Sequence, residues 1–403
     1  MSKKILSGVR IVEFGWAVVG PLTTSWAGGY GAEVIKIETK TRPDVIRTMT
    51  PYKDDRVNLN NSLFFGRENA NKYSLGLNLK HPEGVKIAKR LVAESDCVLD
   101  SYTAGVMDSY GLGYNDLKQI KPDIIMLSSC MYGQTGSLRS MPGYGVPLTA
   151  ISGLTSLCGW PDRPPTGPYG SYTDYLVPRL NLLAIVSALD YRRRTGKGIY
   201  IDAAQLESSV QFVAPALLEY GANQQTFIRC GNASRQAAPH GVFSCKGEDR
   251  WCAISVFTER EWRGFCDVLG NLPWTKKAEF ASLAARKENE AELNTLIEEW
   301  TRQQEDKWIM MEMQKHGVPA GVVNNGRDLG DDPQLIFSNY YRRMEHPEMG
   351  SVDYAPHSIE FSASPQEIFR SPCLGEHTEH ICKNILGFSE QEFERYSAEG
   401  VFE

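Results

Sequence analysis

Short β-rich runs alternate with a helical segment near the start of the chain. Residues 9–14 and 33–37 are runs of mostly apolar and β-branched side chains. Between them, residues 20–29 predict a helix with Pro21 in its first turn and paired glycines at its end. A strand, a helix and a second strand within about 30 residues form a βαβ unit, which implies a parallel sheet.

The same alternation continues as far as residue 200. A helix is predicted from Pro82 and precedes a strand over 97–100, and a shorter helix over 116–120 precedes a strand over 124–128. The next helix, 177–193, ends in basic residues, which suit the negative end of a helix dipole. Strands that alternate with helices in this way are typical of the doubly wound α/β class.

The pattern changes after about residue 245. A strand is predicted over 251–256, and apolar residues then recur at the spacing of one helix face: Leu293, Leu296, Ile297 and Trp300. We therefore predict a second, smaller domain over 225–325. The tail that follows, 330–403, is rich in Pro, Asp and His and carries one late helix near Glu390.

Composition and charge narrow the classes of function. Of the 403 residues, 42% are hydrophobic and 23% are charged, which excludes a disordered chain. The 43 Lys+Arg against 49 Asp+Glu give a net charge of −6, which argues against nucleic acid as the main partner but allows a small anionic ligand. The nine cysteines form no CxxC pair, so no zinc site is expected. Because no signal peptide and no membrane-spanning apolar run are evident, we expect a cytoplasmic protein.

The turn 131–136, Met-Tyr-Gly-Gln-Thr-Gly, directly follows a predicted strand. Carboxyl ends of parallel strands line the ligand crevice, and exposed N–H groups at a glycine-rich turn can hold an anion. The alternative is a plain tight turn that uses glycine for its dihedral angles. Because the turn is not GxGxxG, it gives little support for a nicotinamide cofactor.

Asp174 ends the loop 167–174, which is rich in glycine and tyrosine and precedes the helix predicted over 177–193. The residue is either the N-cap of that helix or a carboxylate that the helix N-terminus keeps ionised and presents to a substrate. A carboxylate can serve as a covalent nucleophile where water is excluded. The two interpretations are compatible.

Several cations lie close to predicted strand ends. They are either solvated side chains or a cluster that binds phosphate on an otherwise acidic protein. These cations are Lys36, Lys40, Arg42, Arg47, Arg67 and Lys72. The seven histidines form no HExxH and no Ser/His/Asp pattern, so we interpret each as structural.

An ordered set of short motifs resembles the class III CoA-transferase family, whose members include formyl-CoA and carnitine CoA-transferases. The matching stretches are LSGVRIVE (6–13), GAEVIKIE (31–38), NKYSL (71–75), YGQTG (132–136), TDY (173–175), TGKGIYIDAA (195–204), GVPAG (317–321) and LGEHT (374–378). Each motif alone is weak evidence for the family, but together the motifs cover almost the whole chain in the expected order, and this ordered set is strong evidence.

The resemblance implies a fold and an assembly. A Rossmann-like, parallel-sheet large domain would comprise 1–200 and 330–403, with a smaller α+β domain over 225–325 and linkers at 201–224 and 326–329. Family protomers are ring-like and interlock as a homodimer, while some members are heteromers of related chains. Coenzyme A thioesters and carboxylic acids enter as substrates, so no metal and no tightly bound cofactor are implied, and neither nucleic acid nor a membrane is a partner.

The resemblance also assigns residue roles. The family nucleophile, an aspartate, maps onto Asp174, whose carboxylate would attack an acyl-CoA thioester to give an anhydride and then an aspartyl-CoA thioester. Backbone N–H groups at Gly133, Gln134 and Gly136 are the candidates for stabilising the oxyanion. The CoA contacts are assigned to Val18, Val19, Lys36, Asn71, Lys72, Leu75, Ser101 and Thr103.

One departure from the family pattern concerns these CoA contacts. Many relatives read Glu-Asn-Phe-Arg-Pro-Gly where residues 100–105 read Asp-Ser-Tyr-Thr-Ala-Gly. Thr103 therefore stands where arginine is usual. A phosphate contact is either missing or supplied from elsewhere.

Two other functions stay open. The α-methylacyl-CoA racemases share the fold and a comparable aspartate but also use a histidine about 30 residues earlier, where this chain has Tyr144. Racemisation needs a second acid/base group near neutral pKa, and tyrosine is a poor substitute, so the transferase is favoured. The third hypothesis is a non-catalytic subunit of a heteromeric transferase.

The acid acceptor is the least determined feature. The aromatic residues near the nucleophile either pack or indicate an aryl-bearing acid; they are Trp160, Tyr169, Tyr172 and Tyr175. We expect an aryl-bearing or dicarboxylic acceptor with succinyl-CoA as the donor. A carnitine-like or short hydroxy acid is the alternative.

Overall fold

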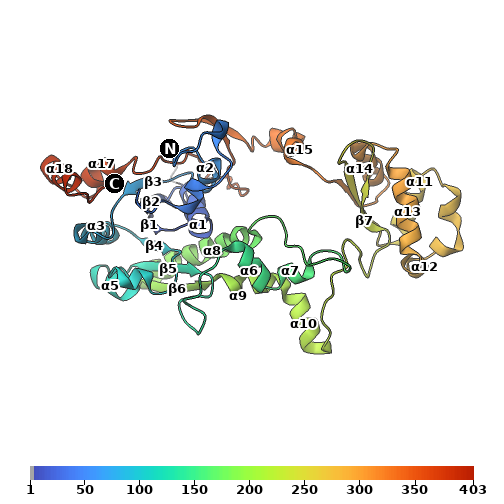
Figure 1. Ribbon diagram of the computed structural model, residues 1–403, viewed down its shortest axis with the longest axis horizontal. Helices are drawn as coiled ribbons and strands as arrows, with labels where there is room; N and C mark the ends of the chain where they lie inside the picture. The colour runs from blue at the N-terminus through green and yellow to red at the C-terminus, as the bar shows by residue number, and fades with distance from the viewer. Residues whose placement is uncertain (1–3) are drawn as a thin grey trace. The chain divides into compact units, whose positions relative to one another are not determined.

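The sheet that organises the fold is parallel, and its strand order is β3-β2-β1-β4-β5-β6 (Figure 1). The computed structural model describes residues 4–403. The strands are β1 (Arg10–Phe14), β2 (Glu33–Glu38), β3 (Tyr73–Gly76), β4 (Cys97–Asp100), β5 (Ile125–Cys130) and β6 (Ile199–Ala204). The order reverses between β1 and β4, which opens a crevice at their carboxyl ends. The predicted Rossmann-like α/β class is confirmed.

Helices cover both faces of this sheet. Because strand side chains alternate, Ile11 and Val12 of β1 enter two different apolar cores. Ile11 shares its core with residues of α1 (Val19–Gly29) and α8 (Tyr172–Thr195). Val12 shares its core with residues of α3 (Pro82–Ala93) and α5 (Tyr114–Ile120). Burial on both faces explains why the strands appear in the sequence as near-continuous apolar runs.

The chain forms two compact units, and their boundaries differ from those of the predicted domains. The larger unit comprises 1–156, 167–227 and 338–403, and the smaller comprises 157–166 and 228–337. The predicted linker 201–224 is therefore regular structure in the larger unit, with α9 (Gln205–Val210) and α10 (Ala214–Asn223) following β6. Further elements of the larger unit are α2 (Leu63–Glu68), α4 (Val106–Ser109), α6 (Gly145–Ile151), β10 (Arg342–His346), β11 (Gly350–Tyr354), α17 (Thr378–His380) and α18 (Glu390–Ala398). The short helix α7 (Leu154–Leu157) crosses the boundary.

The C-terminal tail packs beside the edge strand β3, as the red segment next to β3 in Figure 1 shows. Ser74 and His377 are joined by two hydrogen bonds, and the Asn78 N–H donates to the carbonyl of Val401. Val401 is itself fully buried in the sheet core. The tail thus completes the edge of a sheet that the N-terminal half begins.

The smaller unit has its own core. An antiparallel sheet of β7 (His240–Ser244), β8 (Trp251–Ser255) and β9 (Ala320–Val322) shares this core with four helices. These helices are α11 (Glu259–Val268), α12 (Leu283–Glu288), α13 (Glu290–Thr301) and α14 (Asp306–Lys315), and the unit also contains α15 (Gly326–Gly330) and α16 (Pro333–Phe337). Across the described residues of both units, none of the helices is apolar over a sufficient length to span a membrane.

Candidate active site

A cavity of about 430 Å³ lies in the larger unit, where the loops that follow β1 to β5 meet. We call it the main cavity. Its lining comes chiefly from 15–19, 36–44, 77–80, 101–106, 130–131 and 139–148, together with Asp174 and Gln205. Most of these loops follow strand carboxyl ends, as expected for a doubly wound fold.

Asp174 lies in the first turn of α8, and its side chain lines the main cavity. The N-cap position of α8 belongs to Ser171, whose carbonyl accepts the Asp174 N–H at 2.8 Å. The interpretation of Asp174 as the N-cap is therefore wrong, because the helix begins three residues earlier than that role requires. Asp174 is 9% exposed, so it is nearly buried yet open to the cavity.

The Asp174 carboxyl has no cationic partner among the described residues. Burial raises its pKa to about 7, and a hydrogen bond with the Ser171 side chain only partly opposes that rise. When it is ionised, this carboxylate has little contact with water and no nearby positive charge to stabilise it. It is consequently more reactive towards an electrophile than a solvated one.

Gly145, at the start of α6, makes room for this carboxyl. A Cβ atom at Gly145 would overlap both Asp174 Oδ2 and the Cβ of Ser171. The close approach therefore requires glycine at position 145. The Pro-Gly-Tyr-Gly sequence at 142–145 was the available signal, but the sequence alone did not show which glycine faces the nucleophile.

Beside the cavity lies a cluster of buried acidic and basic side chains that form ion pairs with one another. Glu13 of β1 contacts Lys36 Nζ at 2.9 Å and Lys72 Nζ at 2.8 Å. Lys36 also contacts Asp44 at 2.9 Å. Burial would raise the pKa of Glu13, but the two ammonium groups lower it to about 2. We call Glu13, Lys36, Asp44 and Lys72 the buried charge network.

The lysines assigned to CoA are therefore internally paired. Lys36 lines the main cavity, but its ammonium is fully buried and also donates to the carbonyl of Gly15 at 2.7 Å. Lys72 donates to Pro21 O and Asn69 Oδ1 and does not line the cavity. Within residues 4–403, neither ammonium is left free to bind a phosphate.

The remaining CoA assignments divide into two groups. Val18, Val19, Ser101 and Thr103 line the main cavity. Asn71 and Leu75 are not among its described lining residues. Asn71 bonds to Phe369 of the tail through both backbone and side chain, and Leu75 is fully buried in the sheet core.

The glycine-rich turn does not present its N–H groups to Asp174. The Gln134 N–H donates to the Asp202 carboxylate at 2.9 Å, and Gly133 packs against the same side chain. Neither Gly133 nor Gly136 is among the described residues that line the main cavity. The turn is anchored to β6, so the oxyanion role has no support from its geometry.

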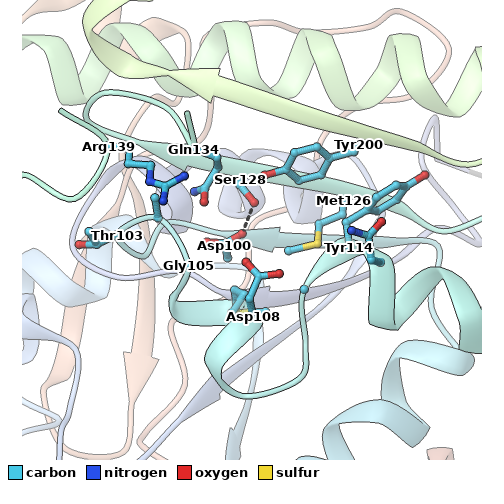
Figure 2. A pocket seen from close by; sticks show the side chains of 14 residues that line it. Asp100, Thr103, Gly105, Asp108, Tyr114, Met126, Ser128, Gln134, Arg139 and Tyr200 are labelled. Carbon is cyan, nitrogen blue, oxygen red and sulfur yellow. Dashed lines mark hydrogen bonds between the residues drawn. The ribbon is translucent and has the colours of Figure 1, made fainter. Parts of the chain in front are cut away.

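A second cavity of about 430 Å³ lies beside the main one, under the ends of β4, β5 and β6 (Figure 2). The Asp100 carboxyl accepts hydrogen bonds from Ser128 and the Tyr102 N–H, and burial raises its pKa to about 7. The rings of Tyr114 and Tyr200 stack with centroids 5.3 Å apart on one side.

Two cations that line the main cavity were not among the candidates predicted from the sequence, whereas a third, Arg42, was. Lys80 and Arg139 are exposed and line it, as does Arg42, whose guanidinium lies 4.5 Å from the centre of the Trp16 ring. Lys80 follows the end of β3 by four positions, as Arg42 follows the end of β2, so the same signal could have found it. Among the described residues, no group of three or more His, Cys, Asp or Glu side chains could hold a metal ion.

Comparisons with known proteins agree with this architecture. The model of CoA-transferase family III matches residues 6–378. Succinyl-CoA:glutarate CoA-transferase of Mus musculus is 32% identical over 405 residues, covering 100% of this chain and 91% of the relative. The succinyl-CoA–L-malate CoA-transferase beta subunit of Chloroflexus aurantiacus is 30% identical, covering 96% and 95%. A crystal structure of a CAIB/BAIF family protein from Brucella suis has a TM-score of 0.86 and 30% identity, covering 95% of this chain and 100% of that one.

These matches extend over almost the whole chain, and the sheet order and the cavity at the strand ends fit them. The protein belongs to CoA-transferase family III and is an enzyme that transfers CoA between an acyl-CoA and a carboxylic acid.

Proposed function

We propose that Asp174 is the covalent nucleophile of this transfer. The observation that carries the proposal is the position of its carboxyl: nearly buried, without a cationic partner in the described residues, and open to a cavity large enough for part of a thioester. A carboxylate with little solvation needs little reorganisation to attack a carbonyl carbon.

The first half of the reaction releases the donor acid. A carboxylate oxygen of Asp174 attacks the thioester carbonyl, the C–S bond breaks, and the thiolate leaves, which gives an aspartyl-acyl anhydride. The thiolate then attacks Cγ of Asp174, the anhydride C–O bond breaks, and the donor acid departs as a carboxylate. Asp174 is left as an aspartyl-CoA thioester.

The second half repeats these steps in reverse with the acceptor. The acceptor carboxylate attacks Cγ of Asp174 and expels the thiolate, and the thiolate attacks the acceptor carbonyl of the new anhydride. The products are the acceptor thioester and the free Asp174 carboxylate. Because the cycle exchanges one CoA thioester for another and regenerates Asp174, the transfer needs no energy input from ATP.

The main cavity supplies groups for the CoA portion. Val18 and Val19 form apolar wall, and Ser101 and Thr103 add hydroxyl groups. The phosphates would be bound by exposed cations rather than by the buried charge network, and Arg42, whose guanidinium lies over the Trp16 ring, is one of these cations.

Chemical trapping tests the nucleophile directly. The enzyme is incubated with succinyl-CoA, treated with borohydride or hydroxylamine, and digested for peptide mass mapping. We expect modification at Asp174 and none at Asp100, a matched internal control because it is also buried and its pKa is also raised to about 7. Full activity without a modified Asp174 would refute the proposal.

The racemase alternative has less support from the cavity. None of the described residues that line it is a histidine, and Tyr144 stands at the position expected for one. Incubation of a 2-methylacyl-CoA in deuterium oxide without an acceptor acid separates the two functions. We expect no deuterium at Cα; incorporation at a rate comparable to transfer would establish the racemase.

We propose a dicarboxylic acid as acceptor and succinyl-CoA as donor. The two relatives described above are named for succinyl-CoA with glutarate and with L-malate, both of which are dicarboxylic acids. The aryl-bearing alternative has less support, because Tyr169 and Tyr172 are exposed and none of the four aromatic residues that precede or follow Asp174 in the sequence is among the described lining of the main cavity. A panel of dicarboxylic, aryl-bearing and hydroxy acids with succinyl-CoA tests this assignment.

We propose a homodimer as the working form. Large apolar side chains are exposed on two helices of the larger unit: Leu183 and Val186 on α8, and Leu217, Leu218 and Tyr220 on α10. Exposed apolar groups of this size are typical of protein interfaces. Native mass spectrometry of the chain expressed alone tests the assembly, and activity of that sample argues against a non-catalytic subunit of a heteromer.

A further inference from the structure

Arg139 stands at the junction of the two cavities. Thr103 and Arg139 are the residues that line both. Figure 2 shows the Arg139 side chain at the same end of the second cavity as Thr103 and Gln134, with the two stacked tyrosines at the other end. A guanidinium in this place can reach a ligand in the main cavity next to the neutral Thr103.

The segment that precedes Arg139 is fixed by hydrogen bonds to β6 and α9. Met131 O accepts the Leu206 N–H at 2.9 Å, and the Gln134 N–H binds Asp202. The Arg139 N–H bonds to Gly136 O, which forms a turn just before the cavity-lining residues from Met141 onward. Arg139 therefore follows an anchored turn by five positions.

Arg139 is also chemically available. It is exposed, and no ion pair with a carboxylate is formed by it among residues 4–403. The buried cations of the same region differ in this respect: Lys36 and Lys72 pair with Glu13, and Arg47 pairs with Glu38 at 2.8 Å. Positive charge for an anionic ligand must consequently come from the exposed cations.

Charge on the second-cavity side makes that side unfavourable for phosphate. Asp100 and Asp108 both line the second cavity, and neither has a cationic partner within 4 Å among the described residues. The main cavity is also lined by carboxylates, but Glu38 and Asp44 are neutralised by Arg47 and Lys36. Like charges at close range oppose binding of an anion in the second cavity. An anionic group at the junction is therefore favoured on the main-cavity side of Arg139.

We infer that Arg139 binds a phosphate of the CoA moiety in the main cavity, which is also lined by the cations Arg42 and Lys80 from the loops after β2 and β3. This inference rests on the proposed function, since it takes CoA as the occupant of the main cavity. A guanidinium offers paired N–H donors that match phosphate oxygens. The contact that an arginine at position 103 would supply comes instead from a separate loop.

The test compares Arg139→Gln with Arg260→Gln, a matched change at an exposed arginine in α11 that lines neither cavity. Each variant is assayed with three succinyl thioesters: of CoA, of 3′-dephospho-CoA and of pantetheine, which has no phosphate. We expect Arg139→Gln to raise KM for the CoA thioester by roughly 10- to 100-fold with kcat within about twofold. KM for the pantetheine thioester should stay unchanged, and Arg139→Lys should restore part of the loss.

The dephospho-CoA thioester identifies which phosphate is bound. An unchanged KM for it assigns Arg139 to the 3′-phosphate, and a raised KM assigns it to the diphosphate; both support the inference. An unchanged KM for the CoA thioester, or an equal rise for the pantetheine thioester, would overturn it. The Asp174 trapping experiment is independent of this result, so failure of the nucleophile assignment can be told apart from failure of the phosphate contact.

Discussion

Glu13 and Asp174 are both buried acids of the larger unit, but their surroundings drive their ionisation in opposite directions. Glu13 lies between two lysine ammonium groups that lower its pKa to about 2, although burial alone would raise it. Asp174 has no such partner in the described residues, and burial raises its pKa to about 7. The Glu13 carboxylate is stabilised by its ion pairs and is therefore unreactive, whereas the Asp174 carboxylate remains reactive.

The difference shows how this fold separates structural charge from chemical charge. Glu13 and Lys36 are register neighbours on adjacent strands, so pairing of β1 with β2 brings them together. Asp174 comes from a helix terminus after a long connection, and it approaches a glycine rather than a cation. Perturbed carboxyls of the second kind mark functional sites more often than paired ones do.

The largest effect is expected from Asp174→Asn, which removes the nucleophile and keeps the shape. We expect transfer activity to fall by at least about 10⁴-fold, because Glu38 and Asp44, the other described carboxylates that line the main cavity, are paired with Arg47 and Lys36. We also expect the variant to be more stable than the wild type at pH 8, by on the order of 3 kcal/mol, since it no longer buries an unpaired charge. Steady-state kinetics and urea unfolding check the two parts, and an unstable but active variant would contradict both.

Glu13→Gln should have the opposite pattern. It leaves two buried ammonium groups without their shared partner, so we expect the free energy of unfolding to fall by about 3–5 kcal/mol. The matched control is Glu33→Gln, whose partly exposed pair with Arg10 should contribute about 1 kcal/mol or less. Urea denaturation of both variants measures the difference; equal losses would mean that the buried charge network contributes no more than a surface pair.

Gly145→Ala tests the close approach that keeps Asp174 in place. The added methyl group would displace the Asp174 carboxyl or the Ser171 side chain, so we expect kcat/KM to fall by roughly 10- to 100-fold with a smaller change in stability. Gly167→Ala serves as control, because a Cβ there meets only the Thr155 hydroxyl at an ordinary 3.5 Å. Equal kinetics for the two variants would show that the approach at Gly145 is not required.

The smallest effect is the pH dependence, and its direction follows from the two pKa shifts. Asp174 must be ionised to attack, so kcat/KM should fall about tenfold per unit as the pH drops below about 7 and level off above it.

Stability should respond in opposite senses. Because the folded pKa of Asp174 is above its ordinary 3.8, its contribution to stability declines as pH rises from about 4 to 7. Glu13 contributes fully above about 4.5, and that contribution is lost as pH falls towards 2. Urea midpoints of the wild type and Asp174→Asn from about pH 2 to pH 8 separate the two contributions; parallel curves above about pH 4 would show that Asp174 does not titrate there.

Much of the sheet could be predicted from the sequence, because parallel strands buried on both faces appear as uninterrupted apolar runs. The predicted strands at 9–14, 33–37, 97–100 and 124–128 correspond to β1, β2, β4 and β5. The four-residue β3 was not recognised as a strand, since its edge is completed by the tail rather than by its own pattern. The helix predicted from 177 begins at Tyr172 instead, because Pro178 is accommodated inside α8.

The site was only partly accessible from sequence. A motif could identify Asp174, but no local pattern distinguishes a lysine that faces a phosphate from one that pairs with a carboxylate on the next strand. Lys36 and Lys72 are of the second kind, and Arg139, from a loop that resembled nothing specific, is exposed at the cavity. Ion pairs between residues far apart in the sequence determine which of these cations can reach a ligand.

The tail that completes β3 has a consequence for synthesis of the chain on the ribosome. His377 bonds to Ser74 across 303 positions. Because the ribosome adds about 5–20 residues per second, β3 is synthesised tens of seconds before the tail that pairs with its edge. The smaller unit, made in between, has a separate core and can fold first. We expect a nascent chain stalled after residue 337 to show protease protection over 228–337 but not over the N-terminal sheet, which would make the last element synthesised the one that closes the first.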